Sequence, residues 1–338
     1  GGRGASAYTA MHVWDAASPP DSAEALHFDT ADVGEPVLGH IVENALIGAA
    51  LARRLARRRE VAEFMPTRLE RLAVGTRAVT VTLDDGRELA ARVVVGADGA
   101  GSRTRECAGI EVSGWPYGQR ALVTHVTTER PHRETAWQRF LPDGPLALLP
   151  LADGRLSVVW STLPEHAEEL EAMDEAAFHT ALTEGSDRAL GAVVGSGPRA
   201  SFPLQLQHAK HYTRPRLALV GDAVHAVHPL AGQGLNLGLL DAAALAEVIA
   251  DGVRDGQDIG DPVVLRRYER WRKGHNVAMM GSLDVLKRLF GAQHEAVRLL
   301  RRAGLGWVNA NAAARAPLVR AAMGTVGRVP RILQPGEF

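Results

Sequence analysis

A strand–turn–helix pattern at residues 217–249 is the feature that most constrains how this chain can fold. It begins with a short apolar run, LALV, that ends at Gly221, as a buried strand of a parallel sheet would. Asp222 comes next, and Gly232 and Gly234 then lead into leucines and alanines at helical spacing. The order of strand, acidic loop, glycine turn and helix therefore predicts an α/β fold with a ligand site where the strand ends.

The glycine turn favours one class of ligand. Glycines at the start of a helix let a ligand approach the backbone, and the unpaired amides of the first turn attract phosphate or a delocalised anion. Asp222, at the carboxyl end of a strand, is placed to accept hydrogen bonds from sugar or polyol hydroxyls. We therefore predict a nucleotide site. The alternative is a plain packing unit in which Gly232 and Gly234 serve only close contact.

Residues 221–238 (GDAVHAVHPLAGQGLNLG) resemble the second flavin motif of the FAD-dependent aromatic hydroxylases, and among them the ubiquinone-biosynthesis hydroxylases of the UbiH, UbiF and UbiI type. Residues 265–273 (LRRYERWRK) are most similar to the UbiI type. In that family the equivalent of Asp222 binds the ribityl chain of FAD, and the segment matching residues 229–236 lies against the isoalloxazine ring and pyrophosphate. The resemblance therefore implies that FAD is held by Gly221, Asp222, Pro229, Gly232, Gln233, Gly234, Leu235 and Asn236.

A second stretch, residues 92–105 (RVVVGADGAGSRTR), combines a short buried strand, a glycine turn and a serine that can cap the following helix. It resembles the DG fingerprint of the same hydroxylases, in which the acid and the distal arginine organise the cofactor site. The resemblance implies this role for Asp98 and Arg105. The alternative is a capped turn with a surface arginine.

The beginning of the chain lacks the dinucleotide-binding unit that such a flavoprotein needs. Within the printed sequence no Gly-x-Gly-x-x-Gly turn follows an apolar strand with an acid about twenty residues later. Residues 8–15 (YTAMHVWD) resemble the interior of the ubiquinone hydroxylases, past their first βαβ unit. We therefore expect a Rossmann-like FAD-binding fold of the aromatic-hydroxylase type, α/β with α+β parts and truncated at its N-terminus, that holds FAD only when the missing unit is restored.

The rest of the sequence predicts a meander and helices. Asp-Gly turns at residues 85–86, 143–144 and 153–154 favour hairpins. Strands are expected at residues 61–65, 68–74, 78–89 (a hairpin), 119–130, 135–141, 146–151, 155–161 and 201–207, and helices at residues 41–58, 165–190, 264–280 and 282–290. We expect a partial FAD-binding domain at residues 1–112, an antiparallel-sheet substrate domain at 113–208, the second flavin motif at 209–255 and C-terminal helices at 256–338.

The resemblance also implies the reaction. Residues 131–140 (PHRETAWQRF) and 144–151 (GPLALLPL) are similar to the ubiquinone enzymes, whose antiparallel sheet roofs the flavin and forms the substrate cavity. The expected activity is hydroxylation of a polyprenylated phenol by a flavin C4a-hydroperoxide, with dioxygen and with NAD(P)H or a protein donor as reductant. Apolar pocket walls are expected from Trp137, Phe140, Trp160 and Phe202, for each of which a place in the sheet–helix core is the alternative.

Two loop residues are candidates for the chemistry. His228 is a possible base that deprotonates the phenol, and Pro229 would fix the backbone beside the flavin. The alternative is a loop histidine that only bonds to the backbone. No metal site is expected, because no carboxylate completes a set with His225 and His228 and the chain has a single cysteine, Cys107.

Charge is unevenly distributed. Residues 261–338 hold fourteen Lys or Arg and five Asp or Glu, a net charge of +9 in a chain whose net charge is −1. This tail suits an anionic lipid surface or an acidic partner. With the resemblance it implies a cytoplasmic enzyme peripheral to the inner membrane, working in a ubiquinone-biosynthesis complex and not with nucleic acid. Solvated helix faces are the alternative.

Two other functions fit parts of the pattern. Small-aromatic hydroxylases and prenyl reductases share parts of both motifs, and substrate-dependent oxygen uptake distinguishes the reactions. The second alternative is not an enzyme: the printed chain, lacking the unit that would supply most adenosine contacts, would be inactive and serve as a flavin-free subunit or lipid-binding scaffold. A flavin absorbance scan of the full-length protein separates these alternatives.

Overall fold

The structure, a computed structural model, describes residues 4–227, 232–291, 304, 306–322 and 327–334. The chain separates into two compact units. The first unit comprises Gly1–Ala62, Gly118–Leu204 and Leu286–Gly324. The second unit comprises Glu63–Tyr117, Gln205–Val285 and Thr325–Phe338. The predicted domain boundaries stay a prediction, since strands β9 (Val112–Thr128) and β14 (Ala200–Ala209) each belong to both units.

The largest sheet has nine strands in the order β17-β14-β9-β12-β11-β10-β2-β3, with β13 also paired to β9. Its other strands are β2 (Ala10–Asp15), β3 (Leu26–Asp29), β10 (Thr135–Leu141), β11 (Gly144–Pro150), β12 (Leu156–Thr162), β13 (Val193–Ser196) and β17 (His225–Ala226). The run β9-β12-β11-β10 is antiparallel, which confirms the predicted antiparallel sheet. Strands β10, β11 and β12 pair in sequence order as a meander, but β9 pairs with β12 and not with β10, so the predicted four-strand meander is wrong at its first strand. Strands β10 and β2 pair in parallel, with Trp137 opposite His12, so the sheet is mixed at this edge.

Two helices cover one face of this sheet, α3 (Pro164–Ala172) and α4 (Glu175–Gly185). Leu170, Phe178 and Leu182 of these helices are fully buried against leucines and valines of the strands. The single helix predicted at residues 165–190 is wrong, because Asp174 begins a new helix by accepting a 2.8 Å hydrogen bond from the Ala177 amide.

The first unit contains three smaller pieces. Strands β1 (Ala5–Tyr8) and β4 (Gly39–Val42) pair in an antiparallel ribbon, and α1 (Asn44–Leu55) follows with no buried residue. A short 3-10 helix η1 (Thr30–Asp32) contacts α8 (Ala312–Ala322) through an ion pair between Asp32 and Arg315.

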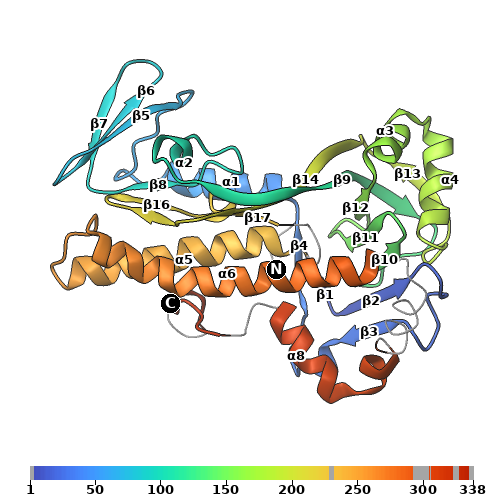
Figure 1. Ribbon diagram of the computed structural model, residues 1–338. Helices are drawn as coiled ribbons and strands as arrows, with labels where there is room; N and C mark the ends of the chain where they lie inside the picture. Colours follow the sequence, from blue (N-terminus) through green and yellow to red (C-terminus); the bar gives the residue numbers. More distant parts are fainter. Residues whose placement is uncertain (1–3, 228–231, 292–303, 305, 323–326, 335–338) are drawn as a thin grey trace. The chain divides into compact units, whose positions relative to one another are not determined.

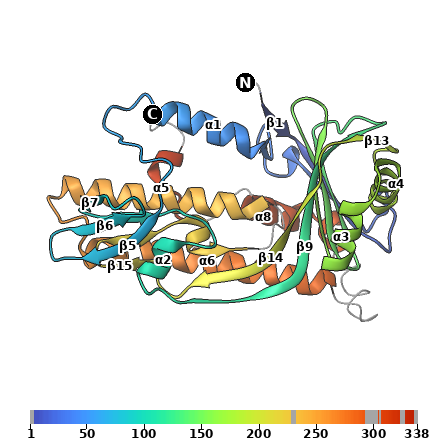
Figure 2. The same cartoon turned by 90° about the horizontal axis from the view of Figure 1, so that it is seen from above.

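The second unit is built on two small sheets with helices. One sheet orders β15 (Thr213–Arg214), β16 (Leu217–Leu219) and β8 (Val94–Gly96), and the other orders β5 (Leu69–Val74), β6 (Val79–Leu83) and β7 (Glu88–Ala91). Its helices are α2 (Arg103–Cys107), α5 (Gln233–Arg254) and α6 (Pro262–Gly291), with the 3-10 helices η2 (Gly221–Ala223) and η4 (Arg331–Leu333). Helices α5 and α6 run side by side (Figures 1 and 2). The core of the unit joins β16 to residues of these two helices, among them Leu245, Val264 and Tyr268.

Two further predictions about elements need correction. Residues 61–65 form no strand, and the two helices predicted at 264–280 and 282–290 are one helix, α6. Ser282 lies inside this helix and its hydroxyl bonds to the Ala278 carbonyl one turn earlier, so it does not cap a new helix. No helix in the described part of the chain is long and apolar enough to cross a membrane.

Candidate flavin site

The two motifs found in the sequence lie side by side in the second unit. Strand β8 pairs in parallel with β16, Gly96 opposite Leu219, and the Val220 amide donates a 2.9 Å hydrogen bond to the Gly96 carbonyl. Asp98 therefore follows one strand and Asp222 follows its neighbour, both at the carboxyl end of the sheet. That edge is where open α/β sheets bind nucleotides.

The Asp98 carboxylate accepts hydrogen bonds from residues of its own turn. One carboxylate oxygen accepts a hydrogen bond of 2.5 Å from the Ser102 hydroxyl, and the other accepts bonds of 2.9 Å from the Thr104 amide and hydroxyl. Burial by itself raises the pKa of this carboxyl, but the donors at Ser102 and Thr104 outweigh it and hold the pKa below its ordinary value. Asp98 thus fixes the turn in its ionised form.

Arg105 connects the two motifs. Its guanidinium is buried and donates hydrogen bonds of 3.0 Å to the Ala223 carbonyl and 2.8 Å to the Ala100 carbonyl. Ala223 directly follows Asp222, so Arg105 holds the loop after β8 against the loop after β16. The arginine is therefore not a surface residue, and its contacts position both loops.

Asp222 is exposed in η2, and within the described part of the chain no group donates a hydrogen bond to its carboxylate. The backbone around it is tightly packed: Gly221 has φ +61°, and a Cβ added at Gly238 of α5 would lie 3.1 Å from the Gly221 Cα. The turn therefore presents an uncommitted carboxylate at the start of the helix.

The first turn of α5 is suited to an anion. Gly232 precedes it with φ +63°, has no neighbour within 4 Å of an added Cβ, and no side chain caps the helix. Gln233 is buried, whereas Leu235 and Asn236 are exposed. The amides of this turn lack partners inside the helix. Together with Asp222 they fit FAD: a carboxylate for polyol hydroxyls, open space for close backbone approach, and donors for negative charge.

The predicted catalytic residues precede this helix in the sequence. His228, Pro229 and their neighbours to residue 231 lie outside the described residues, so their roles stay predictions.

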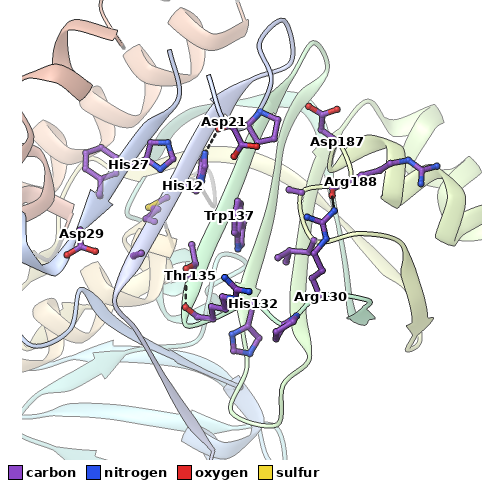
Figure 3. A pocket seen from close by; sticks show the side chains of 18 residues that line it. His12, Asp21, His27, Asp29, Arg130, His132, Thr135, Trp137, Asp187 and Arg188 are labelled. Atoms are coloured by element: carbon purple, nitrogen blue, oxygen red, sulfur yellow. Dashed lines mark hydrogen bonds between the residues drawn. The ribbon is translucent and has the colours of Figure 1, made fainter. Parts of the chain in front are cut away.

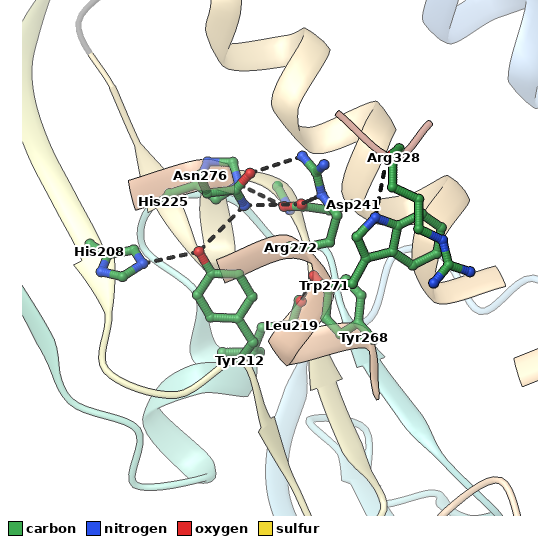
Figure 4. Close-up of polar contacts among 11 residues, drawn as sticks. His208, Tyr212, Leu219, His225, Asp241, Tyr268, Trp271, Arg272, Asn276 and Arg328 are labelled. Carbon is green, nitrogen blue, oxygen red and sulfur yellow. Dashed lines mark hydrogen bonds and ion pairs between the residues drawn. The ribbon is translucent and has the colours of Figure 1, made fainter. Parts of the chain in front are cut away.

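His225, which precedes these residues in the sequence, is fully buried and takes part in a charged network (Figure 4). Its Nε2 lies 2.6 Å from Oδ2 of Asp241 on α5. The other oxygen, Oδ1, accepts hydrogen bonds from Arg272 Nε at 2.8 Å and from Asn276 Nδ2 at 3.0 Å, both on α6. Asp241 is 0% exposed, and burial alone would raise its pKa. His225 and Arg272 outweigh burial and hold that pKa below its ordinary value.

The network extends to the strands. Asn276 Nδ2 also donates to the Tyr212 hydroxyl at 3.3 Å, and His208 Nε2 lies 3.0 Å from the same hydroxyl. Tyr268 donates a 2.7 Å bond to the Leu219 carbonyl of β16. Hydrogen bonds thus join the segment after β16, helix α5 and helix α6 to the sheet.

Sequence reasoning missed Asp241, Arg272 and Asn276. One signal was available: Asp241 is an acid within the apolar pattern of α5, where an unpaired charge would be costly. Arg272 and Asn276 are also four residues apart and so share a face of α6.

The four predicted pocket aromatics do not form one wall. Trp160 is buried in the core under α3 and α4, and Trp137 packs against that core. Phe140 is three residues from Trp137 on the same strand and therefore faces the other side of the sheet. Phe202 is 56% exposed.

Comparison with known proteins agrees with this geometry. Residues 38–281 match the model of the FAD binding domain family. The ubiquinone hydroxylase UbiL of Rhodospirillum rubrum is 42% identical, over 89% of this chain and 70% of the relative. The human mitochondrial ubiquinone biosynthesis monooxygenase COQ6 is 38% identical, over 90% and 73%, and the 3-demethoxyubiquinol 3-hydroxylase of Escherichia coli is 37% identical, over 82% and 71%.

Solved structures agree as well. The probable FAD-dependent monooxygenase PqsL of Pseudomonas aeruginosa superposes with a TM-score of 0.72 at 26% identity, covering 90% of this chain and 82% of its own. The p-nitrophenol 4-monooxygenase PnpA of Pseudomonas putida gives 0.76 at 19% identity, covering 96% and 82%, which shows a shared fold. The chain belongs to the FAD binding domain family and, within it, to the FAD-dependent monooxygenases of ubiquinone biosynthesis.

Proposed function

We propose that the protein hydroxylates the aromatic ring of a polyprenylated phenol in ubiquinone biosynthesis, using FAD, dioxygen and a reductant. The observation that carries the proposal is the uncommitted Asp222 carboxylate beside the uncapped start of α5, at the carboxyl edge of β8 and β16. The relatives named for ubiquinone hydroxylation support the substrate class.

Each part of the site has a distinct task. When bound and reduced, FAD supplies the activation of dioxygen for transfer to an electron-rich ring. Asp222 accepts hydrogen bonds from the cofactor's polyol chain, and the α5 amides stabilise negative charge on it. Arg105 and the network of Asp241 hold the loops in place. His228 is the proposed base toward the phenol, and Pro229 the residue that fixes the backbone beside the flavin. Unchanged turnover and pH profile in His228→Ala would remove that histidine from the mechanism.

The reductant is NAD(P)H or a protein donor. A prenylated phenol dissolves poorly in water, so we further propose that the enzyme works at the surface of the inner membrane or in a biosynthetic complex, with residues 261–338 facing anionic lipid. Retention on anionic vesicles at low salt, lost at high salt, tests this electrostatic contact. Failure to bind at low salt would contradict it.

The central test concerns Asp222. Protein expressed from its whole coding sequence is expected to carry FAD, seen by absorbance, and to consume oxygen when given a prenylated phenol and reductant. Asp222→Asn should weaken FAD binding by about 10- to 150-fold, because hydrogen bonds to a charged group contribute about 1.5–3 kcal/mol.

Asp255→Asn is the matched control, because Asp255 is an exposed aspartate at the other end of the same helix. It should leave FAD binding unchanged. A wild-type protein that stays colourless with excess FAD would favour a flavin-free scaffold. FAD binding without oxygen uptake would favour a reductase.

A further inference from the structure

The first unit contains a polar cavity of about 690 Å³. Its lining comes from strands β2, β3 and β10 and from the loops at residues 130–133 and 187–190. Its described lining includes no residue of either flavin motif. Figure 3 shows Trp137 in the middle of the lining, with His12 and His27 on one side and Arg130 and Arg188 on the other. The cavity thus combines an aromatic floor with a basic side.

The floor is a cluster of neutral rings. The His12 and Trp137 rings stack with centroids 4.8 Å apart and planes 17° apart, and the His27 centroid lies 3.9 Å from that of His12. Burial lowers the pKa of both histidines, and a neighbouring positive group lowers each pKa further. Near pH 7 the floor therefore offers aromatic surface without charge.

The basic side has three arginines, Arg130, Arg133 and Arg188. Among the described residues no carboxylate lies within ion-pair distance of any of them, and Arg130 makes only a 3.4 Å bond to the Arg188 carbonyl. All three are exposed at the rim. Their guanidinium groups are therefore open to solvent around the cavity.

Two of the three aspartates in the lining have other partners. Asp187 forms an ion pair with Arg139 at 3.8 Å, and Asp29 accepts a 2.9 Å hydrogen bond from the Ala31 amide as the cap of η1. Asp21 is the third and faces the histidines. The lining thus holds three arginines and three aspartates, and the ion pair of Asp187 and the hydrogen bond of Asp29 are with groups other than these arginines.

The backbone of both loops is unusual. Four of the five non-glycine residues with positive φ in the described chain lie here: Arg133, Glu134, Asp187 and Arg188 (φ 50°, 54°, 55° and 52°). Such conformations are disfavoured for side chains other than glycine and tend to gather at binding sites. They bring Arg133 and Arg188 to the same cavity.

We propose that this cavity binds a purine nucleotide, with the base against the Trp137 side and the phosphates on Arg130, Arg133 and Arg188. Arginine pairs with phosphate through two parallel hydrogen bonds, and aromatic rings stack on bases irrespective of sequence. The cavity volume lies in the range of small-molecule sites, about 300–1,000 Å³. NAD(P)H is such a nucleotide. The use of NAD(P)H as reductant rests on the proposed function, whereas nucleotide binding in this cavity does not.

The test is a titration of the flavin-loaded, full-length protein with 2′,5′-ADP, which has base and phosphates but no redox group, followed by calorimetry. We expect saturable binding that weakens at higher salt. The double substitution Arg130→Glu with Arg188→Glu should weaken it at least tenfold. Arg59→Glu, at an exposed arginine of the same unit outside the cavity, should not. Trp137→Leu should weaken it about fivefold or more.

Three smaller ligands separate the contributions. Adenosine and inorganic phosphate should each bind more weakly than 2′,5′-ADP. Equal affinity for phosphate, tighter binding of 4-hydroxybenzoate, no saturable binding at millimolar concentration, or insensitivity to the double arginine substitution would each overturn the proposal. Because the readout is binding, a protein that binds 2′,5′-ADP but hydroxylates nothing would refute the proposed function alone.

Discussion

At the scale of single residues, Asp241 is the most consequential side chain of the second unit. It is the single acid among the described groups of the network, and it faces His225, Arg272 and Asn276 without solvent contact. Taking these groups out of water is costly, so the network is tolerated only while every partner is present. Loss of the negative charge would leave Arg272 buried without a counter-ion.

Asp241→Asn is therefore expected to lower the free energy of unfolding by about 3–5 kcal/mol, the usual result of breaking a buried pair. Asp251→Asn, ten residues along the same helix, removes a partly exposed partner of Arg331 and should cost at most about 1 kcal/mol. Urea unfolding of both variants measures the difference. Equal losses in the free energy of unfolding would mean that the buried Asp241 contributes no more to stability than the partly exposed Asp251.

Sequence alone could identify only part of the site. Asp222 and the helix glycines stand in a continuous pattern next to a strand, so local spacing predicts a ligand site there, whereas the role of Asp98 was implied by the family resemblance. The partners of Asp241 come from a strand 16 residues before it and from a helix 31 residues after it, and no local period relates these positions. The opposite orientation of Trp137 and Phe140, by contrast, follows from the two-residue period of a strand.

At the scale of elements, the approach of α5 to η2 sets the shape of the flavin site. Gly221 and Gly238 meet backbone to backbone, with the added Cβ of Gly238 only 3.1 Å from the Gly221 Cα. A side chain there would have to move the start of α5 relative to Asp222.

Two glycine substitutions separate this contact from helix propensity. Gly274→Ala, at an exposed position of α6 with nothing within 4 Å, should stabilise the protein by up to about 1 kcal/mol. Gly238→Ala gains the same propensity but meets the Gly221 backbone, so we expect it to be destabilising and to weaken FAD binding. Thermal unfolding with and without FAD measures both. Equal stabilisation by the two alanines would show that the backbone at Gly221 moves aside for the added Cβ at Gly238 without a cost in free energy.

Most elements were predictable, and the failures have local causes. The Asp-Gly turns correctly predicted the hairpins β6–β7, β10–β11 and β11–β12. Strand β9 was expected to begin at residue 119 but begins at Val112, so it includes Gly114, Pro116 and Gly118. In the fold an added Cβ at Gly114 would lie 2.0 Å from the Leu206 carbonyl oxygen, so this glycine serves a close strand contact that sequence cannot distinguish from a turn.

At the scale of the whole molecule, the basic C-terminal region is partly neutralised by the rest of the chain. Arg328 pairs with Glu247, Arg331 with Asp251, and Arg315 with Asp32. Arg272 is buried against Asp241. The surplus of +9 counted along the sequence therefore overstates the positive charge available to a lipid surface. Vesicle binding by this region should be correspondingly weak at physiological salt.

Stability of the whole molecule should fall on mild acidification. Burial lowers the pKa of four histidines, two in each unit: His12, His27, His208 and His275. In the unfolded chain a histidine has a pKa of about 6.5. Between that value and the lowered folded pKa, the unfolded state binds more protons than the folded state, so the free energy of unfolding decreases as pH falls.

We expect urea midpoints to be level above about pH 7 and to drop as pH falls below about 6.5. Each unit by which a histidine pKa is lower in the folded state than in the unfolded state corresponds to about 1.4 kcal/mol of unfolding free energy. His208→Gln, which keeps a hydrogen-bonding side chain toward the Tyr212 hydroxyl, should make the drop smaller. His40→Gln, at an exposed ring, should leave it unchanged. A midpoint that stays constant from pH 7.5 to 5.5 would show that these four histidines accept protons in the folded protein as readily as in the unfolded chain.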